Sequence, residues 1–548
     1  MNEDKDEKIN NLENKYNSMF EKINELDENK KDIDKNSINL KYNGYGYGQT
    51  NILGEEFVKN NMNNIEVFVN GSRPEELAKV SLKSGENKIK LKIIHPILNA
   101  SYMFYNCSTL TNISGLKNLD IQNCNNFSYM FYGCTSLSDI KPIEKWKTSK
   151  GKNFSYMFHK CISISDIKPL ENWNVSNGND FSYMFYGCKS LQNIKPLEKW
   201  NVSNCHNFSN MFNGCKSLQD INPLEKWDIT NSSNFSYMFY DCSSLSNISS
   251  LANWNISNNF KSNESPSSSD FKINDFSFMF GACSSLSDIK PLEKWNNTCS
   301  NTINGIFYQC SSLSDIKPLE KWNVSSCSDL SYIFYGCKLI SDIQPLKNWN
   351  VSNCNNFSHM FHNYSSARKI FFIKTKSSKD NKSSESSSLL SNLQPLEKWN
   401  VSNGKNFSYM FCGCSSLSEI KGLEKWDLSE CNNISFMFSE CGELSDIYPL
   451  EYWNVSKCND FSYMFNKCQS LSDITPLEKW NVSNGNNFKY LFYDCSSLSN
   501  IKPLEKWNVS NGHNFSCMLD NCSSSLDIKP LKKWKISKSL LKDIKNKK

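Results

Sequence analysis

The chain has 548 residues, of which 39% are hydrophobic, and its 61 basic residues nearly balance its 56 acidic residues. A formal net charge of +5 predicts no strong nucleic-acid footprint, so no nucleic-acid partner is expected. No stretch approaches about 18 consecutive apolar residues and the opening residues are charged, so we expect neither a membrane span nor a cleaved signal peptide.

Residues 1–40 are predicted to hold a coiled-coil helix and a linker. Apolar residues from Ile9 to Ile33 alternate spacings of three and four, with Lys30 at one core position and charges at the remaining heptad sites. This pattern favours a short coiled coil and a homodimer through residues 9–33. A lone solvated helix is the alternative, because about three and a half heptads are marginal for pairing.

Residues 41–98 are predicted to form a small α+β cap that shields the first repeat. The glycine-rich residues 44–48 lack the lysine and the helix start of a phosphate-binding loop, so a linker is expected there. A helix is expected over residues 55–60. Alternating apolar residues predict strands at 65–69 and 89–93.

Residues 99–537 are dominated by a 27-residue period, because all 14 tryptophans share one phase. Two longer intervals of 41 and 50 residues are explained by insertions near 258–274 and 365–391. With Leu119 at the same phase one period earlier, the array has about 15 units of 27 residues. Such self-similarity predicts supersecondary units that stack to share a core, with residues 538–548 as a basic C-terminal cap and tail.

Each unit is predicted to contain one short helix and one short parallel strand. Phe154, Met157, Phe158 and Cys161 have the spacing i, i+3, i+4, i+7 of one helix face. A strand is expected at 137–140 and its equivalents, because the proline that recurs just afterwards cannot donate to a ladder. The predicted fold class is therefore α/β, a solenoid with a parallel sheet on one side.

The repeated string Met-Phe-x-x-Cys-x-x-Leu-x-x-Ile-x-Pro at 184–196 resembles the BspA-type leucine-rich repeat. The longer unit, with Trp-Asn-Val-Ser-Asn and Phe-Ser-Tyr-Met-Phe at 173–185, is similar to the roughly 26-residue surface-protein repeat of bacteria, mycoplasmas and microbial eukaryotes. The resemblance covers about 99–537. It implies a leucine-rich-repeat-like fold and, by analogy, adhesion or protein binding.

The cysteines follow the repeat as well. Fourteen of the 23 share one phase from Cys107 to Cys522, and neither they nor the others form paired zinc knuckles. A ladder of buried thiols is the favoured interpretation, with disulfides between repeats as the alternative. Buried thiols would suit a reducing, intracellular compartment.

Candidate functional residues form two charged rows rather than a catalytic constellation. Histidines stand where other units have Tyr or Asn and are interpreted as surface substitutions, so no catalytic, cofactor-binding or metal-ligating residue is predicted, and the chain is not expected to be an enzyme. The rows are either a solvated charged face or a ligand surface, with lysines offsetting repulsion between the stacked carboxylates. The candidate interaction face comprises Asp139, Asp166, Asp220, Asp288, Asp315, Asp342, Lys141, Lys168, Lys195, Lys290 and Lys317.

Two functions from different classes remain open. One is a non-enzymatic, cytoplasmic scaffold for protein–protein interaction, with a protein ligand and no cofactor. The other is a cell-surface adhesin of the BspA type, exported by a route that the sequence does not reveal.

Overall fold

The computed structural model describes residues 37–256, 274–295, 302–363, 388–534 and 536–544. Contacts between Cα atoms divide the chain into two compact units. The first unit comprises the described residues up to Gly178, with 188–190 and 199–201, and the second comprises 179–187, 191–198 and the described residues from 202 onward. Each unit is described by itself, and one continuous array over 99–537 stays a prediction. The predicted coiled coil lies outside the described residues.

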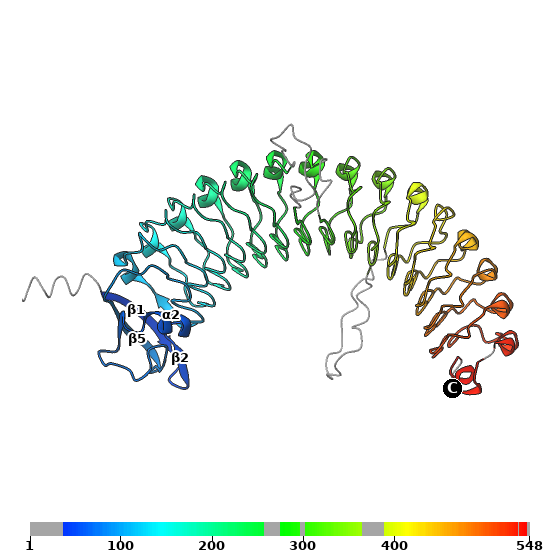
Figure 1. Ribbon diagram of the computed structural model, residues 1–548, viewed down its shortest axis with the longest axis horizontal. Helices are drawn as coiled ribbons and strands as arrows, with labels where there is room; N and C mark the ends of the chain where they lie inside the picture. The colour runs from blue at the N-terminus through cyan, green and yellow to red at the C-terminus, as the bar shows by residue number, and fades with distance from the viewer. Residues whose placement is uncertain (1–36, 257–273, 296–301, 364–387, 535, 545–548) are drawn as a thin grey trace, which may run out of the picture. The chain divides into compact units, whose positions relative to one another are not determined.

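The N-terminal cap contains two antiparallel sheets and one helix (Figure 1). β1 (Ser37–Gly44), β3 (Ile65–Val69), β5 (Gly85–Ile93) and β6 (Leu110–Asn112) pair in the order β3-β5-β1-β6. The second sheet joins β2 (Gln49–Asn51) and β4 (Lys79–Ser81), and α2 spans Glu55–Asn61. The predicted helix and the predicted strands at 65–69 and 89–93 are confirmed. β1 begins at Ser37, inside the predicted coiled-coil and linker range of 1–40, and residues 45–48 connect β1 to β2 without regular secondary structure.

The larger sheet of the cap has one buried and one open face. Side chains alternate between the faces of a strand, and in β1 the buried set is Ile38, Leu40 and Tyr42, each at most 2% exposed. The Tyr42 hydroxyl donates to the Ile52 carbonyl oxygen at 2.6 Å, which satisfies its polar end inside the core. Because β6 belongs to the first repeat, this sheet joins the cap to the start of the array.

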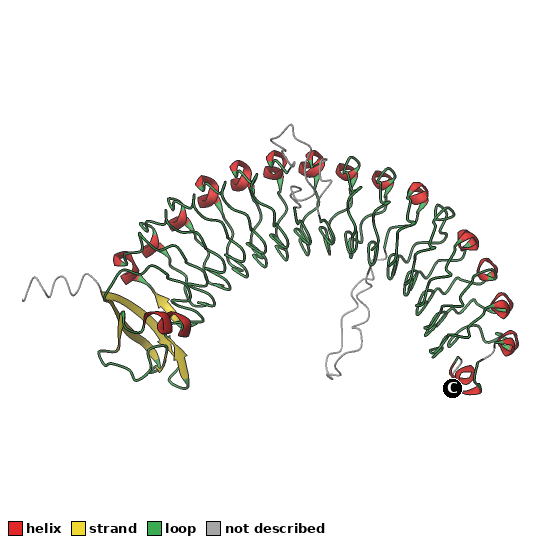
Figure 2. Cartoon of the chain, viewed as in Figure 1, coloured by secondary structure: helices red, strands yellow, loops and turns green. Residues whose placement is uncertain are grey.

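Most repeats contain one short 3-10 helix, and these helices lie at the same place in successive repeats (red in Figure 2). In most of them a proline occupies one of the first two helical positions, where no backbone donor is needed. Their bounds are η1 (Ser114–Asn118), η2 (Lys141–Ile143), η3 (Lys168–Leu170), η4 (Lys195–Lys199), η5 (Asn222–Lys226), η6 (Ser249–Asn253), η7 (Lys290–Lys294), η8 (Lys317–Leu319), η9 (Gln344–Leu346), η10 (Gln394–Lys398), η11 (Tyr448–Tyr452), η12 (Thr475–Leu477), η13 (Lys502–Lys506) and η14 (Lys529–Lys533).

The helix predicted around Phe154 to Cys161 is wrong, because these residues form consecutive tight turns. Alternate backbone N–H groups donate to the next repeat: Phe127 N lies 2.8 Å from Asn153 O and Tyr129 N lies 3.0 Å from Ser155 O. An α-helix would direct those donors to its own preceding turn. Bonding between repeats therefore uses these alternate donors, while the N–H groups between them close tight turns within the segment, as from Met130 N to Phe127 O at 3.3 Å.

The strand predicted before the recurring proline is also largely wrong. Most parallel bridges between described repeats lie instead just before the core phenylalanine, as between Asn126 and Asn153 or between Asp460 and Asn487. At the predicted place the described residues contain two bridges, Asp220 to Asn247 and Glu419 to Asp446. Each bridge involves one residue per repeat, so the parallel pairing is reduced to isolated bridges rather than a continuous sheet.

Tryptophan and phenylalanine side chains fill the core between repeats. Each of the 14 tryptophans donates its indole Nε1–H to a Leu or Ile carbonyl oxygen of the preceding repeat, at 2.8–3.2 Å. The bond persists across both insertions, from Trp295 to Leu251 and from Trp399 to Leu346. The insertions therefore leave the stacking of their flanking repeats unchanged.

The C-terminal segment supplies the last repeat with the hydrogen-bond acceptors that other repeats receive from the repeat that follows them. α3 (Lys538–Asp543) is capped by Ser537, whose side chain accepts from Leu540 N. Its end supplies the carbonyl oxygens of Asp543 and Ile544, which accept from Cys517 N at 2.9 Å and Leu519 N at 3.0 Å. Ile544 is fully buried. The carbonyl oxygens at the end of α3 thus bond to the last repeat, in the region where a C-terminal cap and tail over 538–548 stays a prediction.

Candidate interaction surfaces

The predicted aspartate row serves the backbone of its own chain. In each case the carboxylate accepts from the N–H group two residues later, at 2.7–2.8 Å, where the 3-10 helix begins. This is the Asx-turn geometry that recurs at turns and helix starts. The residues concerned are Asp139, Asp166, Asp220, Asp288, Asp315 and Asp342. The row therefore has a structural role as a set of turn caps.

The predicted lysine row occupies the first position of the 3-10 helices and is exposed. It comprises Lys141, Lys168, Lys195, Lys290 and Lys317. Lys195 pairs with Glu198, one helical turn on, and among these eleven candidates no lysine is ion-paired with an aspartate. The structure does not bring the two predicted rows together as compensating charges.

A different charge ladder joins successive repeats and was missed by the sequence analysis. The glutamate two residues before the tryptophan of one repeat pairs with the lysine just before the tryptophan of the next, as between Glu397 and Lys425 at 2.8 Å. That hydrogen bond lowers the pKa of the Glu397 carboxyl. The ladder was signalled by the repeated Glu-Lys dipeptide, but solvent-exposed pairs of this kind contribute little to stability. The others are Glu171–Lys199, Glu198–Lys226, Glu293–Lys321, Glu451–Lys479, Glu478–Lys506 and Glu505–Lys533.

Two columns of aromatic side chains, half-buried or buried, run along the turns that replace the predicted helix. We define column A by the residue two positions after the core phenylalanine. In the first unit it contains Tyr102, Tyr129 and Tyr156, with ring centroids 4.6 and 4.4 Å apart. In the second unit an uninterrupted stack contains Tyr332, His359, Tyr409, Phe436, Tyr463 and Tyr490, with neighbouring centroids 4.1–4.7 Å apart.

Column A is held in an unusual backbone conformation. Tyr129 and Tyr463 have φ of 58° and 57°, and Phe436 has 58°, all in the left-handed region. Bulky L-residues rarely adopt this region, which costs roughly 1–2 kcal/mol per residue. The turns and the bonds between repeats impose it at nearly every described repeat.

Column B lies three residues further along each repeat and is shorter. Tyr105, Tyr132 and His159 stack at 4.7 and 4.3 Å in the first unit. In the second unit His362 contacts column A, with its Nδ1 atom 2.9 Å from that of His359. Burial lowers the pKa of His359 to about 4 and that of His362 to about 3. The interpretation of these histidines as surface substitutions is wrong for His159 and His362, which are buried.

The cysteines form the predicted thiol ladder. All 22 described cysteines are free, and 20 of them are buried. From Cys134 onward, each thiol of the main phase lies against a phenylalanine carbonyl oxygen of the preceding repeat, as at 3.1 Å between Cys161 Sγ and Phe131 O. Burial raises the pKa of Cys188 and Cys337 to about 12, so these thiols remain protonated and unreactive at neutral pH.

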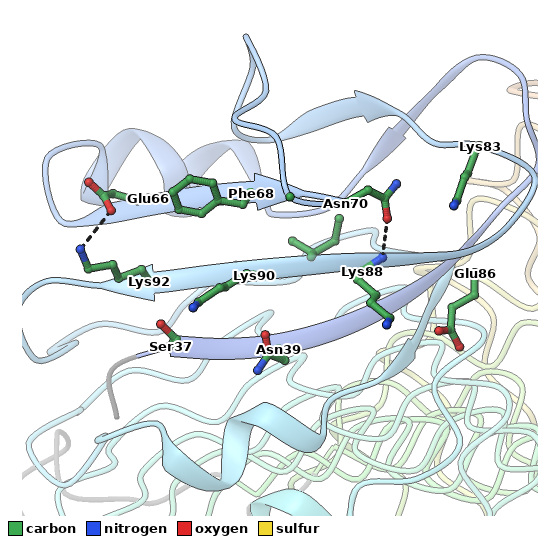
Figure 3. A pocket seen from close by; sticks show the side chains of 12 residues that line it. Ser37, Asn39, Glu66, Phe68, Asn70, Lys83, Glu86, Lys88, Lys90 and Lys92 are labelled. Carbon is green, nitrogen blue, oxygen red and sulfur yellow. Dashed lines mark hydrogen bonds and ion pairs between the residues drawn. The ribbon is translucent and has the colours of Figure 1, made fainter. Parts of the chain in front are cut away.

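The open face of the cap sheet forms a shallow hollow with several lysines (Figure 3). Glu66 and Phe68 line it from β3 and Asn70 from the turn after β3; Lys88, Lys90 and Lys92 line it from β5, and Ser37 and Asn39 from β1, while Lys83 and Glu86 stand at one end. We call these ten residues the lysine face. In the register of the sheet, Lys90 lies between Phe68 and Asn39. The sequence analysis identified the alternating strand of β5 but not this face, because it did not predict β1 beside it.

Among the described residues no helix is long and apolar enough to cross a membrane. In the same part of the chain, no group of three or more His, Cys, Asp and Glu side chains is arranged to hold a metal ion.

The repeated bonds and recurrent 3-10 helices define a repeat protein. Five segments, 98–198, 168–271, 274–384, 381–472 and 444–546, match the family described as "Mycoplasma protein of unknown function, DUF285". The matches cover most of the chain, which therefore belongs to this family. Searches of curated proteins and of solved structures found no significant match.

Proposed function

We propose that this chain is a non-enzymatic protein-binding scaffold, built as a leucine-rich-repeat-like solenoid that presents aromatic column A to a protein ligand. The bonds between successive repeats support a stacked array, in which each repeat contacts its neighbours and offers the same surface again. Repetition of one surface suits an extended partner better than a small molecule.

The single observation that carries the proposal is the stack from Tyr332 to Tyr490. Its rings are half-buried, so each keeps an exposed edge while its faces contact the rings of neighbouring repeats. A ring fixed in this way loses little conformational entropy when a partner covers it. Aromatic residues are also enriched at protein interfaces and among their hot spots.

The charged edges of the repeats support the proposal less well. The aspartates are occupied by backbone N–H groups, and the glutamates two residues before the tryptophans are paired with lysines of the following repeat. A partner at either edge would have to displace these bonds. Column A can be covered without breaking any of them.

A photo-crosslinking experiment in native cells tests the binding surface. Tyr463 of the full-length protein is replaced by benzoylphenylalanine, and the same replacement at exposed Lys502 of η13 is the matched control. We expect a discrete protein adduct from position 463 and none from position 502. No adduct, or equal adducts from both positions, would remove column A as the binding surface.

The compartment is a separate part of the proposal. Buried, free thiols support a reducing cytoplasmic environment, whereas the resemblance to BspA-type surface repeats favours the alternative, a cell-surface adhesin. Fractionation of native cells with protease shaving of intact cells distinguishes them: loss of the protein on shaving would favour the adhesin, and its survival the scaffold.

Self-association through residues 9–33 is the remaining partner proposal. The heptad pattern supports a weak parallel dimer. A truncation should end at residue 36, because β1 begins at Ser37 and removing it would damage the cap sheet. Light scattering should show a monomer after this truncation, and a persistent dimer would place the interface in the remaining chain.

A further inference from the structure

We propose that the lysine face of the cap sheet is a docking site for the acidic segment formed by residues 1–36 of the same chain. The proposal rests on the described face, on its charge, and on the composition and attachment point of the segment. It is independent of the function proposed for column A.

The lysine face presents three parallel rows of side chains away from the core. Lys88, Lys90 and Lys92 form the middle row on β5, with their neighbours Ile89 and Leu91 buried on the other side of the sheet. Successive lysines of such a row are about 6.6–6.8 Å apart, because a strand rises about 3.3–3.4 Å per residue. Phe68 lies opposite Lys90 and adds a half-exposed ring to the centre of the face. The hollow can therefore contact both charged and apolar groups.

The charge of the face is not balanced from within the sheet. Glu66 is shared between Lys92 at 3.2 Å and Arg73 at 3.7 Å, and Glu86 pairs with Lys41 at 3.0 Å. These pairs occupy both carboxylates that line the hollow.

Two lysines of the face remain available to an incoming anion. Lys83 and Lys88 are exposed, and no described carboxylate is ion-paired with either. A ligand with several carboxylates would complement this surplus.

The segment that precedes β1 has the complementary charge. Residues 1–36 contain eleven acidic and seven basic residues. Glu21, Glu25, Glu28 and Asp32 have spacings of four, three and four, so the predicted helix would carry them on one face. One helical turn advances about 5.4 Å, close to the interval between lysines of the row.

The place of attachment favours this occupant over a free peptide. Ser37, the residue that follows the segment, itself lines the hollow. A short covalent connection gives an effective concentration on the order of millimolar, so even weak ion pairs would keep the segment on the face. Glu21 follows Met19 by two residues, and Glu25 follows Ile23 by two residues. Two residues of a helix turn by about 200°, so these carboxylates lie on nearly the opposite side of the predicted helix from Met19 and Ile23. Docking would therefore leave the apolar seam free to pair.

Zero-length carboxyl-to-amine crosslinking of the full-length protein tests the proposal. We expect links from Glu21, Glu25 or Glu28 to Lys83, Lys88 or Lys92, identified by mass spectrometry. An equimolar mixture of isotope-labelled and unlabelled chains separates links within one chain from links between chains. Predominantly mixed-isotope links would show that a second copy occupies the face, and links from 1–36 to lysines elsewhere would place the segment elsewhere; either result overturns the proposal.

A charge-reversed variant provides the second arm. In Lys88→Glu/Lys90→Glu, the links made by the retained Lys83 and Lys92 should fall at least fivefold, and they should fall similarly in the unaltered protein at 0.5 M salt. Lys145→Glu, at an exposed position of the first unit, is the matched control and should leave the links unchanged. Hydrogen exchange of β5 amides verifies that the variant sheet is folded. Undiminished links in the folded variant would overturn the proposal.

Discussion

The buried tryptophans offer the sharpest test of how the repeats hold together. Trp453 is 4% exposed, and its indole donates to Leu423 O at 3.0 Å. Its ring stacks on Trp426 at 6.3 Å and contacts Phe438 at 6.4 Å. Trp453→Ala removes the ring and leaves a cavity, which costs about 3–5 kcal/mol at buried aromatic sites. The Leu423 carbonyl oxygen, which loses its hydrogen-bond donor, adds to this cost unless water reaches it.

Two further variants separate the contributions. Trp453→Phe keeps most of the buried ring but leaves Leu423 O without its donor, which should cost about 1–3 kcal/mol. Tyr452→Ala alters the adjacent residue, whose side chain is 57% exposed, and should change stability by less than about 0.5 kcal/mol. The expected order of destabilisation is therefore Trp453→Ala, then Trp453→Phe, then Tyr452→Ala.

Hydrogen exchange of the full-length protein measures where the stability is lost. A loss of about 4 kcal/mol corresponds to an increase of roughly several-hundred-fold in the opening equilibrium. Because stacked repeats are stabilised mainly by their nearest neighbours, faster exchange should be confined to peptides around residues 423–465 and absent from 303–337. Equal effects of Trp453→Ala and Tyr452→Ala, or faster exchange spread over the whole second unit, would refute this account of the core.

Three other expectations follow from burial and backbone geometry. Acidification from pH 6.5 to 4 should destabilise the fold, because histidines bind protons in the unfolded chain whereas buried His359 and His362 stay neutral in the folded chain. The free energy of unfolding, measured by urea titration, should fall by about 1.4 kcal/mol per pH unit for each proton, and His359→Tyr/His362→Tyr should reduce this slope. In a timed alkylation mapped by mass spectrometry, partly exposed Cys517 should react well before buried Cys468, and equal rates would contradict the thiol ladder. Phe436→Val should lower the urea midpoint more than Phe436→Asn, because φ is 58° there and a β-branched residue tolerates this region poorly; the reverse order would argue against strain in column A.

The repeat length, the cap elements and the thiol ladder were predictable because each leaves a local signal. Tryptophan spacing fixes the period, and alternation at 65–69 and 89–93 fixes two strands of the cap. The false helix had a local signal too. A spacing of i, i+3, i+4, i+7 also arises when successive tight turns return side chains to the same side, and Phe154 to Cys161 follow that path. The tight turns are favoured over the helix because alternate N–H groups bond to carbonyl oxygens of the next repeat, and local periodicity cannot reveal such bonds.

The candidate site was predicted less well, for reasons of a similar kind. Asp139 and its equivalents repeat because each backbone turn needs an acceptor, and the spacing of two residues to Lys141 was the available sign of an Asx turn. The aromatic columns were visible as Tyr in Phe-Ser-Tyr-Met-Phe, but the predicted helix would have separated them. The lysine face depends on β1 lying next to β5, a pairing of residues about 50 apart in sequence that no local pattern encodes.

The matching donor and acceptor edges of the repeats have a consequence for how the gene can change. Trp295 and Trp399 reach the preceding repeat across insertions of very different length, so the bond depends on the phase of a repeat and not on its position in the chain. Unequal recombination that adds or deletes a whole 27-residue block would place a repeat with its tryptophan donor after a repeat with its carbonyl acceptor, as in the present chain. Both ends, at β6 and at Ile544, would stay as they are. Closely related strains should therefore encode versions that differ in length by multiples of 81 nucleotides, three for each residue of the period.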